Sequence, residues 1–154
     1  MKILFFAMLA SAFSLSYASE DVEQYGDWVK SEKWAGYVSK EMTRGTVDAI
    51  IRDSVRDDNS LAFGILFPID TCYMYEKYPE PFGNMLVLGS YNNFLMQCLE
   101  RGVAVAFPDN DFVQDSIVEE LINGNNICLS TDEVKACFSS KGFKDMKEAI
   151  KNKS

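Results

Sequence analysis

The sequence predicts a mainly β fold, an antiparallel sheet of the β-sandwich type with one or two short helices near the C-terminus. Short apolar runs recur about every 8 to 12 residues with turn residues between them, which is typical of sandwiches and barrels. The clearest run alternates Leu61, Phe63, Ile65 and Phe67 and ends at Pro68, as a half-buried strand does. A clear helical period follows only after residue 110. An α+β fold is the alternative.

The N-terminal residues 1–18 have the layout of a secretory signal peptide. Lys2 precedes an uncharged run over residues 3–13, and small residues, among them Ser16 and Ala18, follow it. The apolar run is about half of the roughly 20 residues that a membrane-spanning helix needs, so we expect no stable membrane insertion. We predict cleavage near Ala18 and a single globular domain over residues 19–154, periplasmic or secreted.

The first half of this domain is expected to contain strands over residues 34–42, 46–55 and 61–67. Residues 46–55 also fit one face of a helix, but their β-branched side chains and the preceding Gly45 favour a strand. Residues 56–60 are all polar or charged and predict a turn.

The middle of the chain is expected to continue as short strands. A short run begins at Tyr73, and residues 77–84, which are rich in Pro and Gly, predict a loop. Asn92 and Asn93 predict a break in the strands that follow, which we expect over residues 85–91, 94–99 and 103–107. A helix over residues 94–103 is the alternative, because its apolar residues also fit one helical face.

A helix is predicted over residues 111–123. Its apolar face carries Phe112, Val113, Ile117 and Leu121. Asp109 or Asn110 can cap the N-terminus, and Gly124 can end the helix. A second short helix is expected after Gly142, with Phe143, Met146 and Ile150 on its apolar side.

Residues 126–138 between these helices predict a β-hairpin with a two-residue turn at Asp132 and Glu133. This turn places Ile127 opposite Phe138, Leu129 opposite Ala136, and Cys128 opposite Cys137. Directly opposed residues have Cα atoms about 4.5 to 5.5 Å apart, which permits a disulfide. A helix from Thr131 is the alternative, because residues 130–133 fit a capping box.

All four cysteines lie after the signal peptide, and an even number in an exported chain predicts two disulfides. The hairpin register pairs Cys128 with Cys137, which leaves Cys72 to pair with Cys98 by elimination. A zinc site is disfavoured because the chain has no CxxC pair and no histidine. We therefore expect no metal and no cofactor.

The absence of histidine limits the catalytic chemistry that the chain can perform. It excludes Ser-His-Asp and Cys-His arrangements and the usual proton shuttle near neutral pH. The adjacent carboxylates at residues 57–58 and 119–120 point apart on a helix or strand. Residues 109–111 resemble the start of a calcium loop, but Gln114 occupies the position of its glycine. We therefore expect no catalytic residues.

The charge of the chain predicts the class of partner. The chain has 15 basic and 23 acidic side chains, and Lys2 is the only charged residue in the predicted signal peptide. Residues 19–154 therefore carry 14 basic and 23 acidic side chains, a net charge of −9. Nucleic acids and anionic lipids bind clustered Lys and Arg, so neither is expected as a partner. A basic protein is the expected partner, and the oligomeric state is left open.

The best candidate binding site surrounds the predicted loop at residues 77–84. Tyr78 and Phe82 are anchor candidates, and Glu76 and Glu80 supply an acidic rim, a pattern that suits a protein interface. Core packing is the alternative for most of the neighbouring aromatic residues, which are Tyr73, Tyr75, Tyr78, Phe82 and Tyr91.

The order of elements from Val103 onward, strand, helix, strand, strand and helix, resembles small periplasmic β-sandwich proteins. These are grouped loosely with invasion-associated locus B proteins and type VI secretion-associated accessory proteins, and the similarity covers the C-terminal half. The matching residues are Phe138, Gly142, Phe143 and Ala149. They are packing positions, so the resemblance implies a fold and offers no catalytic residue to carry across.

These observations favour a non-enzymatic periplasmic domain that binds another protein. Its most concrete form is an inhibitor or immunity protein against an exported basic enzyme or effector. The alternatives are an accessory factor of a secretion or pilus assembly machine, and a carboxylate-dependent hydrolase or exported toxin.

Overall fold

The structure is a computed structural model that describes residues 21–56 and 58–153. The predictions of a signal peptide and of cleavage near Ala18 lie outside the described residues. Within the described ranges, no helix is long and apolar enough to cross a membrane.

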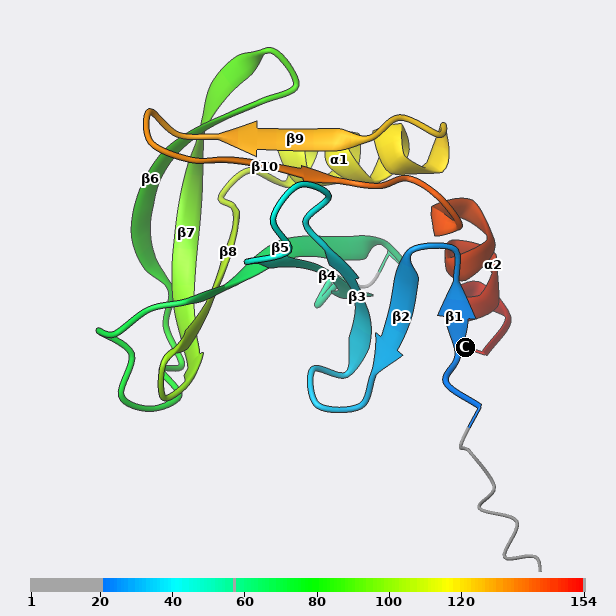
Figure 1. Cartoon of the computed structure of the whole chain (residues 1–154), viewed down its shortest axis with the longest axis horizontal. Helices are drawn as coiled ribbons and strands as arrows, with labels where there is room; N and C mark the ends of the chain where they lie inside the picture. Colours follow the sequence, from blue (N-terminus) through cyan, green and yellow to red (C-terminus); the bar gives the residue numbers. More distant parts are fainter. Residues whose placement is uncertain (1–20, 57, 154) are drawn as a thin grey trace, which may run out of the picture.

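In the described residues, ten strands form one antiparallel sheet, accompanied by two helices (Figure 1). The strands are β1 Gln24–Tyr25, β2 Trp28–Ser31, β3 Gly36–Lys40, β4 Asp48–Asp53, β5 Leu61–Pro68, β6 Glu80–Val87, β7 Ser90–Glu100, β8 Val103–Pro108, β9 Ile127–Ser130 and β10 Lys135–Phe138. Their order in the sheet is β1-β2-β3-β4-β5-β8-β7-β6-β9-β10. The helices are α1 Asp111–Ile122 and α2 Phe143–Lys153. The predicted mainly β class is confirmed, and both helices lie in the last third of the chain.

The sheet curls until its two ends meet. The amide of Met42, just after β3, donates to the carbonyl of Cys137 in β10 at 2.9 Å. The indole Nε1 of Trp28 in β2 donates to the carbonyl of Ser139 at 3.0 Å. One continuous sheet therefore supplies facing walls that enclose a core.

The core lies on one face of this curled sheet. Odd-numbered residues of β4 and β5 point into the core, among them Ile51 and Phe63, whose exposed fractions are 0% and 1%. The helices complete the core: α1 contributes Ile117 and Leu121, and α2 contributes Phe143 and Met146. The rings of Trp28 and Phe143 meet edge to face with centroids 5.1 Å apart, which joins β2 to α2.

The helix predicted over residues 111–123 is confirmed as α1, but Phe112, which was expected on its apolar face, is exposed. The side chain of Asn110 accepts a hydrogen bond from the amide of Phe112 at 2.8 Å and caps the helix. Of residues 109–111, Asn110 thus caps the helix and Asp111 lies in its first turn. The alternative helix over residues 94–103 is wrong, because residues 94–100 belong to β7, residues 101–102 form a turn and β8 begins at Val103.

The predicted hairpin is confirmed in its register. Cys137 pairs with Cys128, Ala136 with Leu129, and Phe138 with Ile127. The amide of Thr131 donates to the carbonyl of Val134 at 2.8 Å and closes the two-residue turn. Both disulfides form as predicted, Cys128–Cys137 with Cα atoms 4.0 Å apart and Cys72–Cys98 with Cα atoms 5.5 Å apart.

Two predictions about the middle of the chain are wrong. The loop expected at residues 77–84 ends early, because β6 begins at Glu80. The break expected at Asn92 and Asn93 does not occur, because both residues pair with β6 inside β7. The chain turns instead at Leu88 and Gly89, whose positive φ values of 55° and 81° suit a two-residue hairpin turn.

Candidate partner-binding site

The segment between β5 and β6, residues 69–79, is a loop that is fastened to the end of the β7–β8 hairpin. The amide of Ile69 donates to the carbonyl of Gly102 at 3.0 Å, and the amide of Gly102 donates to the carbonyl of Cys72 at 2.9 Å. The Cys72–Cys98 disulfide joins the same loop to β7. Cys72 is buried in a small second cluster with Met96, Cys98 and Ala104. The base of the loop is therefore held by covalent, hydrogen-bonded and apolar contacts.

The part of this loop that follows Cys72 carries four large exposed side chains. We name residues 72–78 the tyrosine loop. The exposed fractions are 74% for Tyr73, 67% for Met74, 60% for Tyr75 and 76% for Tyr78. Single exposed apolar residues are ordinary on protein surfaces, but a group of aromatic side chains in one anchored loop is typical of a protein interface.

Glu76, Tyr78 and Glu80, three of the predicted site residues, are exposed at the end of the loop and the start of β6, beside β7. The amide of Glu76 donates to the carbonyl of Cys98 at 3.0 Å, and its carbonyl accepts from Nε2 of Gln97 at 2.9 Å. Its carboxylate is left on the surface. The ammonium group of Lys77 lies 5.5 Å from the ring centre of Tyr78. Glu80 is exposed at the start of β6.

Phe82 differs from the other predicted site residues. It lies within β6, at a bulge between Pro81 and Gly83, and its exposed fraction is 39%. Its ring centre is 5.4 Å from that of Phe67, which itself packs against both apolar clusters. Phe82 therefore packs partly against the fold, which agrees with the alternative explanation of core packing given for the aromatic residues near the loop.

Core packing is the wrong explanation for the tyrosines of this region. Tyr73, Tyr75 and Tyr78 are exposed, and Tyr91 at the start of β7 is 63% exposed. Sequence reasoning assigned Tyr73 and Tyr75 to a short strand-like run and did not include Met74 in the site. The available signal was Cys72 directly before them, since a disulfide at that point fixes the loop by its base and lets the next residues project.

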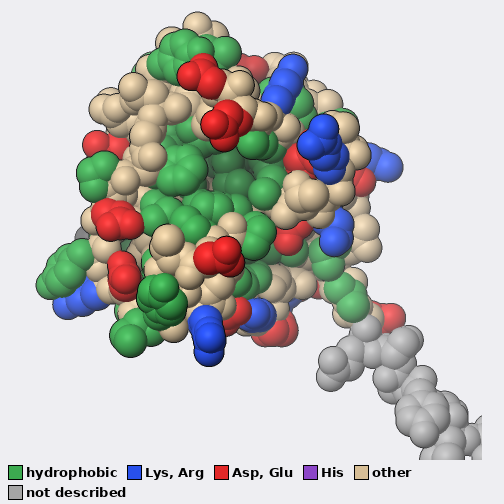
Figure 2. Space-filling model, turned by 60° about the vertical axis from the view of Figure 1, so that its left-hand side comes forward, with side chains coloured by type: hydrophobic (Ala, Val, Ile, Leu, Met, Phe, Trp, Pro, Cys, Tyr) green, Lys and Arg blue, Asp and Glu red, His purple; other side chains and the backbone are tan. Residues whose placement is uncertain are grey.

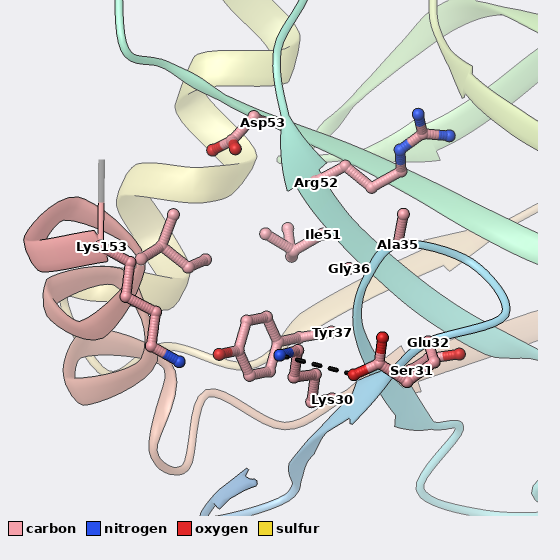
Figure 3. A pocket seen from close by; sticks show the side chains of 11 residues that line it. Lys30, Ser31, Glu32, Ala35, Gly36, Tyr37, Ile51, Arg52, Asp53 and Lys153 are labelled. Atoms are coloured by element: carbon pink, nitrogen blue, oxygen red, sulfur yellow. Dashed lines mark ion pairs between the residues drawn. The ribbon is translucent and has the colours of Figure 1, made fainter.

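A separate cavity of about 350 Å³ lies between β2, β3, β4 and α2. Figure 3 shows the hydroxyl of Tyr37 and the ammonium group of Lys153 pointing toward one another there, while Arg52 points away. Both bind the same carboxylate of Glu23, Lys153 at 2.6 Å and Tyr37 at 2.5 Å. Hydrogen bonds from Lys153 and then Tyr37 lower the pKa of Glu23 to about 2. Burial, followed by the bond to Glu23, raises the pKa of Tyr37.

Glu23, Tyr37 and Lys153 thus form one hydrogen-bonded and ion-paired cluster. It joins β1 to the end of α2, because Glu23 precedes β1 and Lys153 is the last residue of α2. A carboxylate with a pKa near 2 is a poor proton acceptor at neutral pH. We therefore interpret the cluster as a structural clasp.

Glu41 is a second carboxylate with a strongly shifted pKa, and its role is also structural. It accepts hydrogen bonds from the amides of Arg44 at 2.5 Å, Thr43 at 2.9 Å and Gly45 at 3.1 Å. The bond from Arg44, the largest cause, and those from Thr43 and Gly45 lower its pKa to about 2. The carboxylate holds the turn that follows β3.

Two further acidic residues, Asp58 and Glu120, also accept local hydrogen bonds. The carboxylate of Asp58 accepts from the amide of Ser60 at 3.1 Å, and that of Glu120 accepts from Asn125 at 2.8 Å. Within residues 21–56 and 58–153, no group of three or more Cys, Asp or Glu side chains is arranged to hold a metal ion.

Comparisons with protein-family models, curated proteins and solved structures found no match to this chain. The resemblance of the C-terminal half to invasion-associated locus B proteins and type VI secretion-associated accessory proteins stays a prediction. The exposed side chains of this chain therefore supply the evidence for a function.

Proposed function

We propose that this chain is an exported, non-enzymatic domain that binds another protein through the tyrosine loop. The observation that carries the proposal is the exposure of Tyr73, Met74, Tyr75 and Tyr78 on a loop whose base is held by a disulfide. Tyrosine supplies a large apolar ring and a polar hydroxyl at a low cost in conformational entropy.

The attachment of the loop favours binding. Association loses affinity when a free loop must be ordered, and a loop held in place before binding avoids part of that cost. The Cys72–Cys98 disulfide and the hydrogen bonds of Ile69 and Gly102 hold the base of this loop in the free protein. Methionine beside the tyrosines adds an adaptable apolar surface.

The expected partner is a basic protein. Glu76 and Glu80 stand beside the tyrosines with Lys77 between them, and the whole chain carries a net charge of −8. Such a charge speeds the encounter with a positively charged surface and slows the encounter with an acidic one. In the most concrete form of the proposal, the domain is an inhibitor or immunity protein against an exported basic enzyme or effector.

The disulfides and the predicted signal peptide support the proposed compartment. Two disulfides suit an oxidising environment outside the cytoplasm. We propose the periplasm or the extracellular medium as the place where the partner is met.

The proposal is tested by capture of partners with matched variants of the exported protein. The triple variant Tyr73→Ala, Tyr75→Ala, Tyr78→Ala removes the aromatic surface. Phe112→Ala is the control, because Phe112 is 78% exposed at the start of α1. The wild type and the control should capture the same protein in equal amount, and the triple variant should lose it at an unchanged melting temperature. Equal capture by all three would refute the proposal.

A further inference from the structure

The two disulfides differ in their access to solvent. Cys72 and Cys98 are only 1% and 4% exposed and lie in an apolar cluster. Cys128 is exposed and Cys137 is half-buried in the β9–β10 hairpin. A dissolved thiolate can attack a disulfide only where it reaches one of the sulfur atoms. The second disulfide is therefore open to attack in the folded protein, whereas the first is not.

The pairing register places the second disulfide on the side of the hairpin that faces away from the core. The core side of the hairpin is formed by Ile127, Leu129, Ala136 and Phe138. The two cysteines alternate with these residues and pair with each other, so both project to the opposite side. The outer side of the hairpin thus presents a sulfur–sulfur bond to solvent.

The position of the hairpin does not depend on this disulfide alone. Phe138 is 0% exposed in the core, and Ser130 pairs with Leu86 of β6. The carbonyl of Cys137 accepts a hydrogen bond from the amide of Met42 at 2.9 Å. These contacts remain when the sulfur–sulfur bond opens, so the hairpin can stay in place in the reduced protein.

A lysine stands beside the disulfide on the outer side of the hairpin. Lys135 lies two residues before Cys137 in β10, so both side chains leave the strand on the same side. Lys135 is exposed, and it makes no ion pair within residues 21–56 and 58–153. The carboxylates of Asp132 and Glu133 belong to the turn and lie farther along the chain from Cys137 than Lys135 does. A neighbouring ammonium group stabilises a thiolate.

This local positive charge contrasts with the surface as a whole. The chain has a net charge of −8, and Figure 2 shows acidic side chains spread over much of one face. Such a surface repels an approaching thiolate. Lys135 supplies a positive charge close to the point of attack, where it favours both the incoming thiolate and the one that leaves.

We infer that Cys128–Cys137 is a redox site that exchanges with an external dithiol, whereas Cys72–Cys98 is purely structural. A thiolate of the dithiol attacks Sγ of Cys128, the more exposed cysteine, and Cys137 leaves as a thiolate beside Lys135. The second thiol of the dithiol, as a thiolate, then attacks the mixed disulfide and releases Cys128. Two electrons and two protons pass to the protein, which gains two thiols, and the dithiol becomes a disulfide.

Timed reduction of the folded, exported protein by dithiothreitol tests this inference. Samples are quenched with acid, the new thiols are alkylated, and peptide mapping assigns them to their cysteines. Cys128–Cys137 should be reduced at least about tenfold faster, because the fold must open before a thiolate reaches Cys72–Cys98. The fluorescence of the buried Trp28 should stay unchanged while the first thiols appear.

Two lysine variants test the role of the neighbouring charge. Lys135→Gln should slow the reduction of Cys128–Cys137 about twofold to fivefold. Lys144→Gln, at an exposed position of α2, is the matched control and should leave the rate unchanged. A reduced thioredoxin serves as a second probe. Selective reduction by this protein as well would identify a dithiol protein as the natural reductant, and selective reduction by dithiothreitol alone would identify a small dithiol.

Other results would overturn the inference. Equal rates for the two disulfides, or faster reduction of Cys72–Cys98, would remove the argument from access. Loss of the Trp28 signal together with the reduction of Cys128–Cys137 would make this disulfide a structural one. An unchanged rate in Lys135→Gln would refute the role of the lysine. None of these measurements involves capture by the tyrosine loop, so the two proposals fail separately.

Discussion

Removal of the Cys72–Cys98 disulfide should destabilise the domain more than removal of Cys128–Cys137. The cysteines of the first pair are 26 positions apart in the sequence and those of the second are 9 apart. The chain-entropy relation then gives about 3.5 kcal/mol for the longer loop and about 2.6 kcal/mol for the shorter one.

Packing increases the difference between the two pairs. Cys72 and Cys98 are buried with Met96 and Ala104, so Cys→Ala changes there also remove apolar contacts. Cys128 is exposed and Cys137 is half-buried, so their removal costs little beyond the chain entropy.

Urea unfolding of the two double alanine variants, followed by tryptophan fluorescence, measures both effects. Trp28 is fully buried in the core and reports its loss. The free energy of unfolding should fall more for Cys72→Ala, Cys98→Ala than for Cys128→Ala, Cys137→Ala. An equal or reversed order would refute both the loop-length argument and the role of the first disulfide in anchoring the tyrosine loop.

Three further changes have definite expected outcomes. Gly142→Ala should cost about 2 to 4 kcal/mol in urea unfolding, because φ is 80° there and a Cβ atom would lie 2.2 Å from a carbonyl oxygen of β1. The fold lowers the pKa of Glu23 from 4.5 to about 2, so the ionised Glu23 stabilises the fold above pH 4.5, and this contribution is lost as the pH falls toward 2. In Glu23→Gln the free energy of unfolding should therefore change less between pH 4.5 and pH 2 than in the wild type. The same pH profile in both proteins would contradict the clasp. Tyr78→Ala should leave the melting temperature unchanged, whereas Phe82→Ala should lower it, because only Phe82 packs on another ring of the fold.

The C-terminal hairpin shows what the sequence alone could predict. Its register followed from local facts: a period of two, a two-residue turn and two cysteines that fall on the same side. The helix α1 could be predicted equally well, because Asn110 precedes it as a cap, Gly124 follows its end, and its apolar residues recur with a helical period. In both places the neighbouring residues determine the structure.

The middle of the chain could not be predicted in the same way. Asn92 and Asn93 resemble turn residues, yet they lie within a strand because β6 pairs with them. Leu88 at the real turn gives no turn signal. The exposure of the tyrosine loop depends on where the Cys72–Cys98 disulfide holds it. The closure of the curled sheet depends on contacts between distant residues, such as Met42 and Cys137, and no local pattern reports them.

Site-specific photo-cross-linking in the native cell tests the central claim most directly. A photoreactive phenylalanine analogue is placed at Tyr75 in one variant and at Phe112 in another, both of them exposed positions. Irradiation should give a discrete cross-linked product from position 75 and none from position 112, and the captured protein should carry a basic surface. The same product from both positions, or none from position 75 while the protein is folded and exported, would contradict binding through the tyrosine loop.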